Sequence, residues 1–101
     1  MIVLYVLEGC PYCNRALQIL KDNKIKYSTI YPENNEEKEL FKKQNNMNTF
    51  PQIFLQINSE NYMKMGGCDN LIEIMNICNN IKNSNVSLDS VYYMYQTLFR
   101  K

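Results

Sequence analysis

Two cysteines lie where a predicted strand meets a predicted helix, and this junction limits the possible folds more than any other feature of the chain. Residues 2–7 form an apolar run rich in Val, Ile and Tyr, which is typical of a strand covered on both faces. Gly9 and Cys10 then interrupt the run, and Pro11 is favoured at the first position of a helix. The helix predicted from Pro11 therefore has Cys10 at its N-terminus and Cys13 one turn further along.

The rest of the chain alternates between strand and helix patterns. Alternating apolar and polar residues predict strands, and apolar residues three or four positions apart predict helices. After the first strand we predict a helix up to about Asp22, a strand over 25–31, a helix over 33–46, strands over 52–57 and 62–65, a helix after Gly66 and Gly67 that ends near 81, and a final helix over 87–101. This order, β-α-β-α-β-β-α plus an extra C-terminal helix, predicts an α/β fold with a four-stranded mixed sheet flanked by helices on both faces.

The composition excludes several classes of protein. The 101 residues suffice for one ordinary domain, and a net charge of +1 gives no electrostatic reason to expect a nucleic acid as partner. The chain contains no histidine, which excludes His-ligated metals and His general bases. The N-terminal apolar run has no basic segment before it and is far shorter than the roughly 20 residues of a membrane span. We therefore expect a cytoplasmic protein in a reducing compartment, with no membrane partner.

Four cysteines, Cys10, Cys13, Cys68 and Cys78, are the main reactive side chains. In a reducing compartment, a close pair is more often catalytic or metal-binding than structural. The unpaired N–H groups and the positive dipole end of a helix N-terminus favour a thiolate at Cys10, which makes this sulfur a good leaving group from a mixed disulfide. A metal site would need about two further ligands. Since Cys78 falls on the apolar stripe of its helix, we expect redox chemistry and no metal.

Three motifs together resemble the dithiol glutaredoxins of the CPYC type, within the thioredoxin-like superfamily. They are Cys10-Pro11-Tyr12-Cys13, Thr49-Phe50-Pro51 and Gly66-Gly67-Cys68-Asp69, in the order and spacing of that family. The resemblance covers residues 1–83, which we take as the glutaredoxin domain. It implies a thioredoxin-like fold and a glutathione-dependent thiol–disulfide oxidoreductase, which reduces glutathione mixed disulfides and protein disulfides with glutathione as the reducing co-substrate.

The resemblance also implies roles for individual residues. By this resemblance Cys10 is the nucleophile, Cys13 is the resolving thiol, and the two form the redox disulfide. The positions that it implies for glutathione binding are Tyr12, Lys38, Thr49, Phe50, Pro51, Gly67, Cys68 and Asp69. Among these, Pro51 matches a cis-proline of the family, and Asp69 matches the partner of the glutathione ammonium group.

The chain departs from the family pattern at three positions. Leu7 stands where Lys or Arg is usual, Phe50 where Val is usual, and Asn70 where Asp is frequent. We expect these changes to affect the affinity for glutathione more than the mechanism. Lys38 and Arg15 each fit a solvated surface position as well as a role near the site.

Two other functions fit parts of the same pattern. A thioredoxin-like protein disulfide reductase would share the cysteine pair, but the glycine pair and Asp69 disfavour it. An iron–sulfur cluster-binding glutaredoxin would use Cys10 and external glutathione, and Pro11 disfavours it by stiffening the loop.

The segment 84–101 extends beyond the resemblance. Its apolar residues repeat at helical spacing after a possible N-cap at Ser87: Leu88, Val91, Tyr92, Tyr95, Leu98 and Phe99. We expect this amphipathic helix to pack on the same domain, although a surface for an interaction partner is the alternative. We also expect a monomer whose partners are glutathione and glutathionylated or disulfide-containing proteins.

Overall fold

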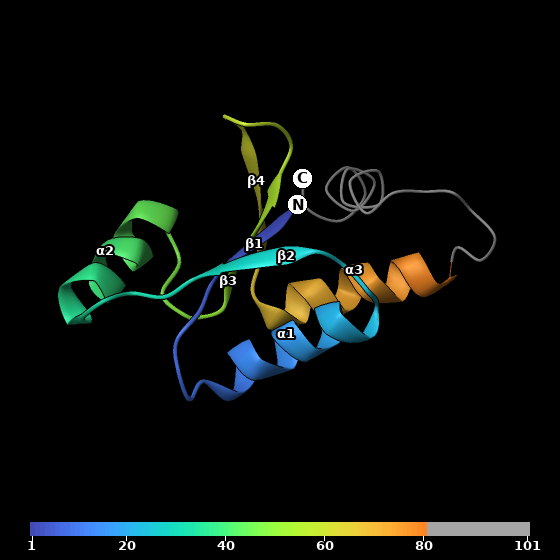
Figure 1. The fold of residues 1–101 in the computed structure, drawn as a ribbon, viewed down its shortest axis with the longest axis horizontal. Helices are drawn as coiled ribbons and strands as arrows, with labels where there is room; N and C mark the ends of the chain where they lie inside the picture. Colours follow the sequence, from blue (N-terminus) through green and yellow to red (C-terminus); the bar gives the residue numbers. More distant parts are fainter. Residues whose placement is uncertain (81–101) are drawn as a thin grey trace.

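A four-stranded sheet and three helices make up the part of the chain that the computed structural model describes, residues 1–80 (Figure 1). In chain order the elements are β1 (Ile2–Tyr5), α1 (Pro11–Asp22), β2 (Tyr27–Ile30), α2 (Asn35–Asn45), β3 (Gln52–Gln56), β4 (Tyr62–Gly66) and α3 (Cys68–Asn80). The strands lie in the order β2-β1-β3-β4. The predicted element order is confirmed over this part, whereas the helix predicted over 87–101 lies outside the described residues.

The pairing of the strands places the starts of two helices at the same end of the sheet. β1 runs parallel to β2 and antiparallel to β3, and β4 is also antiparallel to β3, so the predicted mixed sheet is confirmed. β1 and β4 therefore point in the same direction. Since α1 follows β1 and α3 follows β4, both helices begin at the carboxyl end of these two strands.

Some elements are shorter than their sequence patterns predict. β2 begins at Tyr27 rather than at residue 25, because the Ile25 N–H donates a hydrogen bond of 3.0 Å to the Leu20 carbonyl at the end of α1. α2 begins at Asn35 rather than at residue 33, because the Asn34 side chain accepts a 2.8 Å hydrogen bond from the Glu37 N–H and caps the helix. In both cases a local hydrogen bond sets the boundary.

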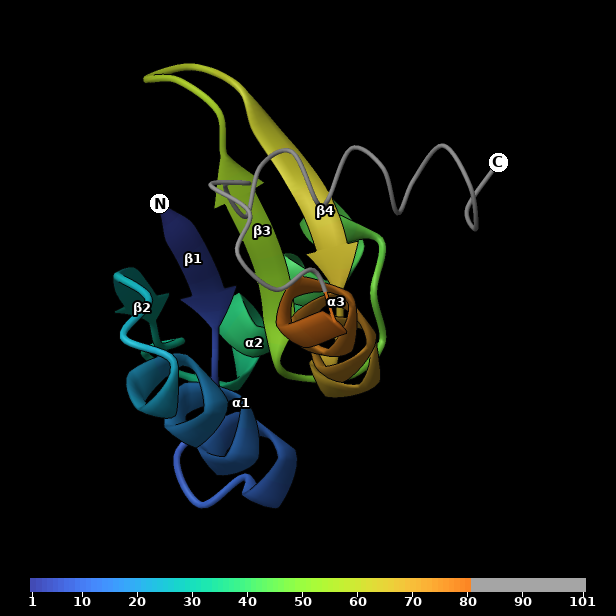
Figure 2. The same cartoon turned by 90° about the vertical axis from the view of Figure 1, so that its right-hand side faces the viewer.

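One face of the sheet packs against α1 and α3 and forms the main core (Figure 2). Alternate residues of β1 and β3 point to this face, where Leu4 lies opposite Ile53 in the antiparallel register and both are fully buried. The helices contribute the buried side chains of Cys13, Ala16 and Leu20 from α1 and of Leu71, Ile74 and Met75 from α3. The apolar run of β1 is thus the central part of the core, as its composition predicts.

The α2 helix lies against the opposite face of the sheet, so helices flank both faces as predicted. Phe41 is the buried side chain of α2, and its ring packs edge-on against Tyr5 of β1 with centroids 4.8 Å apart. The Tyr5 ring also packs edge-on against Phe54 of β3, at 5.7 Å. These three rings attach α2 to the sheet.

A buried glutamine holds the loop between α2 and β3. The side chain of Gln52 is fully buried; it accepts a 2.7 Å hydrogen bond from the Asn45 amide and donates one of 3.1 Å to the Met47 carbonyl. Because a buried polar group is stable only when it is hydrogen-bonded, these two bonds fix the loop of residues 46–51 relative to the end of α2. This loop forms one wall of the site described next.

Candidate active site

Cys10 occupies the N-cap of α1, where the sequence predicts it. Gly9, with φ +69°, turns the chain after β1, and Pro11 is the first helical residue. The Cys10 Sγ accepts a hydrogen bond of 3.2 Å from the backbone N–H of Cys13. That N–H is one of the donors that the first turn of a helix leaves unpaired, so the sulfur lies at the place where a helix stabilises an anion.

The Cys10 thiol also contacts the loop that precedes β3. Its Sγ lies 3.8 Å from the Phe50 carbonyl oxygen, to which the thiol donates. The Phe50–Pro51 peptide bond is cis, which confirms the isomer implied by the resemblance. The sulfur is therefore next to the backbone of a loop 40 residues further along the chain.

Cys13 lies behind Cys10 and faces the core. Its side chain is 1% exposed, whereas Cys10 is only partly buried. Burial, with a smaller contribution from the hydrogen bond to Cys10, raises the pKa of Cys13 to about 12. The two thiols of the pair thus differ: Cys13 stays protonated at neutral pH, and Cys10 is the one that a reagent in solution reaches.

A hollow of about 320 Å³ opens between the start of α1, the loop before β3 and the start of α3; we call it the groove. It is lined by Tyr12, Met47, Thr49, Phe50, Pro51, Gly67, Cys68, Asp69 and Asn70. Tyr12 is 61% exposed at its rim. The groove brings together three segments that are distant in sequence, and these are the three segments that contain the sequence motifs.

All the residues predicted to bind glutathione line the groove except Lys38. Lys38 lies on α2, where it is partly buried, and its backbone N–H donates a 3.0 Å hydrogen bond to the Asn34 carbonyl in the first turn of the helix. Leu7, the position that departs from the usual Lys or Arg, lines a separate hollow with Glu8, Tyr31, Pro32 and Glu33. The structure therefore brings neither side chain into the groove.

Two residues of the groove wall were not predicted as site residues. Met47 stands two residues before Thr49 and belongs to none of the three motifs, so the local sequence did not mark it as a site residue. Asn70 stands three residues after Gly67, and its Oδ1 accepts a 3.0 Å hydrogen bond from the Gly67 N–H. A polar side chain at the third helical position that bonds back to the N-cap is the arrangement of a capping box, and this spacing was the signal available.

The start of α3 borders the groove with its positive end. Gly66 has φ +116° and ends β4, and Gly67 precedes the first helical residue, Cys68. Because residues 67–70 all line the groove, the N-terminal turn of a helix of 13 residues meets it. Such an end favours a carboxylate through its unpaired N–H groups and its dipole.

Cys68 adds a third thiol to this region. It is 5% exposed, and burial raises its pKa, while the positive charge of Arg15 acts in the opposite direction. Arg15 itself is exposed on α1, and its charge acts on Cys68, so the structure fits both the solvated position and the place near the site that its sequence allows. Cys68 is thus a thiol in the groove wall at neutral pH.

A metal-ligand cluster and a membrane-spanning helix are both absent from the described part of the chain. Among those residues, no group of three or more Cys, Asp or Glu side chains is placed to hold a metal ion. None of their helices combines the length and the apolar character needed to cross a membrane.

Comparisons with known proteins agree with this geometry. A model of the glutaredoxin family matches residues 2–60. Glutaredoxin 1 of Rickettsia bellii is 38% identical over 78 residues, which cover 72% of this chain and 74% of the relative.

Solved structures resemble the fold as well. The solution structure of glutaredoxin from Brucella melitensis has a TM-score of 0.59 at 27% identity and covers 85% of this chain and 92% of that one. The crystal structure of a buckwheat glutaredoxin–glutathione complex has a TM-score of 0.63 at 20% identity and covers 76% of this chain and 69% of that one. These likenesses confirm the thioredoxin-like fold.

Proposed function

The chain belongs to the glutaredoxin family and is a glutathione-dependent thiol–disulfide oxidoreductase, and we propose that Cys10 is its nucleophile and the groove its glutathione site. The observation that supports this most directly is the position of the Cys10 sulfur, which accepts the Cys13 N–H at 3.2 Å at the start of α1. A helix N-terminus stabilises a thiolate there.

The reaction proceeds by two exchanges of disulfide bonds. The Cys10 thiolate attacks the glutathione sulfur of a glutathionylated protein, the old S–S bond breaks, and the protein thiolate leaves and takes a proton from water. The thiolate of a second glutathione then attacks the glutathione sulfur bound to Cys10. Cys10 leaves as a thiolate, and oxidised glutathione forms, so the two electrons that reduce the substrate come from glutathione.

The stabilised thiolate helps the second exchange more than the first. A thiol of low basicity is more ionised, but its nucleophilicity falls with a Brønsted slope of about 0.4–0.5, so its attack gains little. As a leaving group it departs faster as its basicity falls. The helix N-terminus at Cys10 therefore favours the step in which Cys10 leaves the mixed disulfide and oxidised glutathione forms.

Protein disulfides follow a second route through Cys13. The Cys10 thiolate attacks one sulfur of the substrate disulfide, the substrate S–S bond breaks, and the first substrate thiolate leaves and takes a proton from water. Cys13 then gives up its proton to water and attacks the Cys10 sulfur of the mixed disulfide. That S–S bond breaks, the second substrate thiolate leaves and is protonated by water, and a Cys10–Cys13 disulfide remains. Two glutathione molecules reduce this disulfide and leave as oxidised glutathione. The raised pKa of Cys13 keeps it from competing as a nucleophile before that step.

The groove suits an extended peptide with charged ends. The loop of Thr49, Phe50 and Pro51 offers backbone groups beside Cys10, as an added strand requires. The N-terminal turn of α3 suits the carboxylate of the γ-glutamyl group, and Asp69, which is exposed in that turn, suits its ammonium group. The Tyr12 ring, at the rim of the groove, covers the middle of the peptide. Lys38 lies outside the groove, and a contact between it and the glycyl carboxylate stays a prediction from the resemblance.

The test is a pair of serine variants, assayed on a glutathionylated peptide with glutathione as the sole electron source. We expect Cys10→Ser to lower the turnover at least about 100-fold and Cys13→Ser to retain most of it, because only the first removes the leaving group of every cycle. On a protein disulfide, Cys13→Ser should also lose turnover.

Activity in Cys10→Ser would overturn the assignment of the nucleophile. Supplying thioredoxin reductase and NADPH in place of glutathione tests the rival activity of a thioredoxin-like reductase, and we expect no turnover. The cytoplasmic location, the monomeric state and the absence of a metal stay predictions.

A further inference from the structure

Among the residues that the structure describes, Gln52 is the polar side chain that is fully buried. It follows Pro51 and begins β3, but it does not line the groove. Because Ile53 points to the face covered by α1 and α3, Gln52 points to the opposite face, where α2 lies. Burial of an amide is costly unless it is hydrogen-bonded, and an apolar side chain would avoid this cost. The amide therefore does something here that packing alone does not.

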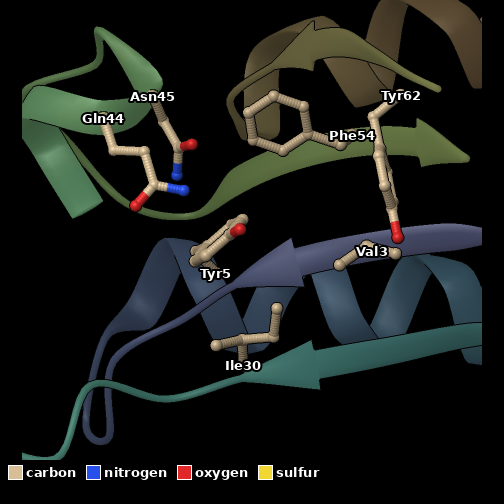
Figure 3. Close-up of a pocket in the computed structure, with 7 residues that line it drawn as sticks. All are labelled: Val3, Tyr5, Ile30, Gln44, Asn45, Phe54 and Tyr62. Atoms are coloured by element: carbon tan, nitrogen blue, oxygen red, sulfur yellow. The ribbon is translucent and has the colours of Figure 1, made fainter. Parts of the chain in front are cut away.

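Both ends of the Gln52 amide are used, and both bonds go to the segment between α2 and β3. Its Oε1 accepts a 2.7 Å hydrogen bond from the Asn45 amide, and its Nε2 donates one of 3.1 Å to the Met47 carbonyl. Figure 3 shows the Asn45 amide directed from α2 toward the chain that enters β3. The Gln52 side chain thus joins the start of β3 to the last residue of α2 and to the first part of the loop.

The loop that these bonds hold supplies much of the groove wall. Of loop residues 46–51, the groove is lined by Met47, Thr49, Phe50 and Pro51. The Phe50 carbonyl oxygen lies 3.8 Å from the Cys10 sulfur, so the same loop also borders the reactive atom. A shift of this loop would move the groove wall and leave α1, whose first turn holds the sulfur, in place.

We propose that Gln52 is a positioning residue, which holds the loop of residues 46–51 at the place that a glutathione moiety in the groove requires. This inference rests on the proposed function of the groove. A peptide that pairs with a loop as an added strand needs the backbone groups of that loop in register, and a misplacement of about 1 Å can cost about 100-fold in rate. A disulfide that does not enter the groove needs only the Cys10 sulfur. Gln52 therefore sets the preference for glutathione and leaves the reactivity of Cys10 unchanged.

The test compares two disulfides in single-turnover reactions of the reduced protein, without added glutathione. Oxidised glutathione places a glutathione moiety in the groove, whereas hydroxyethyl disulfide has no peptide groups and no charged ends. With either one, the Cys10 thiolate attacks one sulfur, the S–S bond breaks, and the other half leaves as a thiolate that takes a proton from water. A Cys13→Ser background stops the reaction at the mixed disulfide with Cys10, which mass spectrometry of quenched samples measures.

Gln52→Met in this background removes both hydrogen bonds and keeps a side chain of similar length. We expect its rate with oxidised glutathione to fall about 10-fold, and its rate with hydroxyethyl disulfide to stay within about twofold of the parent. Asn45→Ala removes one of the two bonds from the other side, so the first rate should fall by a smaller factor. The two changes together should do no more than Gln52→Met alone, because they break the same bond.

Val3→Ala is the matched control for lost stability. Val3 is buried on the same face of the sheet as Gln52, but it lies in β1 and outside the groove. The change should lower the urea midpoint through lost packing and leave the ratio of the two rates as in the parent. Urea unfolding of every variant confirms that it is folded before its rates are compared.

Equal falls with both disulfides in Gln52→Met, an unchanged ratio, or the same change of ratio in Val3→Ala would each overturn the proposal. If Gln52→Met does not fold, Asn45→Ala decides in its place, and a ratio equal to that of the parent would then be the contrary result. A failure of the proposed function looks different. In that case the parent itself would react no faster with oxidised glutathione than with hydroxyethyl disulfide, which would overturn both.

Discussion

At the scale of one residue, the buried Cys13 thiol makes stability depend on pH. Its pKa is raised to about 12 in the folded protein by burial, from an ordinary value of 9.0. Below pH 9 the thiol is neutral in the folded and the unfolded state, so its contribution to the free energy of unfolding is fully present. As the pH rises from 9 towards 12 the unfolded thiol ionises first, so the free energy of unfolding falls by up to about 1.4 kcal/mol per pH unit.

Urea unfolding of the reduced protein at pH 8 and pH 10 measures this effect. Other groups titrate over the same range, so the quantity of interest is the difference between wild type and Cys13→Ala. We expect wild type to lose about 1 kcal/mol more than the variant over this interval. An equal loss in the two proteins would show that the thiol titrates normally in the folded state.

Single residues were predictable where a local pattern marked them. Cys10 and Pro11 stand in a strand-to-helix sequence whose cap geometry is local, so their positions followed from the sequence. Lys38 was different, because whether its side chain reaches the groove depends on how α2 packs. That packing is set by Phe41 on Tyr5, a contact between residues distant in sequence.

At the scale of one element, the start of α3 depends on glycine at position 66. Its φ of +116° is strained for any residue with a Cβ, and a Cβ there would lie 2.6 Å from the Cγ of Asn70. Asn70 would then have to move, and its hydrogen bond to the Gly67 N–H would be lost. We expect Gly66→Ala to lower the free energy of unfolding by about 2–4 kcal/mol, the sum of backbone strain and the lost cap.

Gly67→Ala is the matched control for this change. A Cβ at position 67 meets the Pro51 carbonyl oxygen at 3.7 Å, an ordinary contact, and its φ is not in the left-handed region. Because alanine is a poorer N-cap than glycine, its unfolding midpoint in urea should fall, but by less than that of Gly66→Ala, and its position in the groove wall should raise the KM for glutathione. If both alanine variants unfold at the same urea concentration, the special role of Gly66 is wrong.

Element boundaries were less predictable than element order. The alternation over 25–31 correctly indicates a strand, but the sequence does not show that the Ile25 N–H belongs to the last turn of α1. The fully buried Gln52 is a similar case, because a glutamine beside apolar strand residues gives no sign that Asn45 and Met47 will satisfy it. Such bonds form only when the elements have packed.

At the scale of the whole molecule, one sheet serves two surfaces. The carboxyl ends of β1 and β4 bring the starts of α1 and α3 together at the groove. The α2 face bears a second hollow of about 300 Å³, lined by Val3, Tyr5, Ile30, Gln44, Asn45, Phe54 and Tyr62 (Figure 3). Among the residues that the structure describes, those of the groove lie between positions 12 and 70. We therefore expect catalysis to be independent of residues 84–101.

Removal of residues 84–101 tests this separation in the whole molecule. The remaining domain keeps every groove residue that the structure describes, so we expect turnover with glutathione close to that of the full chain. If the segment packs on the domain, we expect its removal to lower the free energy of unfolding by about 1 kcal/mol and the Tm by about 4–8 °C. Calorimetry and turnover measure the two effects. An unfolded circular dichroism spectrum would contradict the domain boundary at residue 83, and an unchanged Tm would contradict the packing of the segment on this domain.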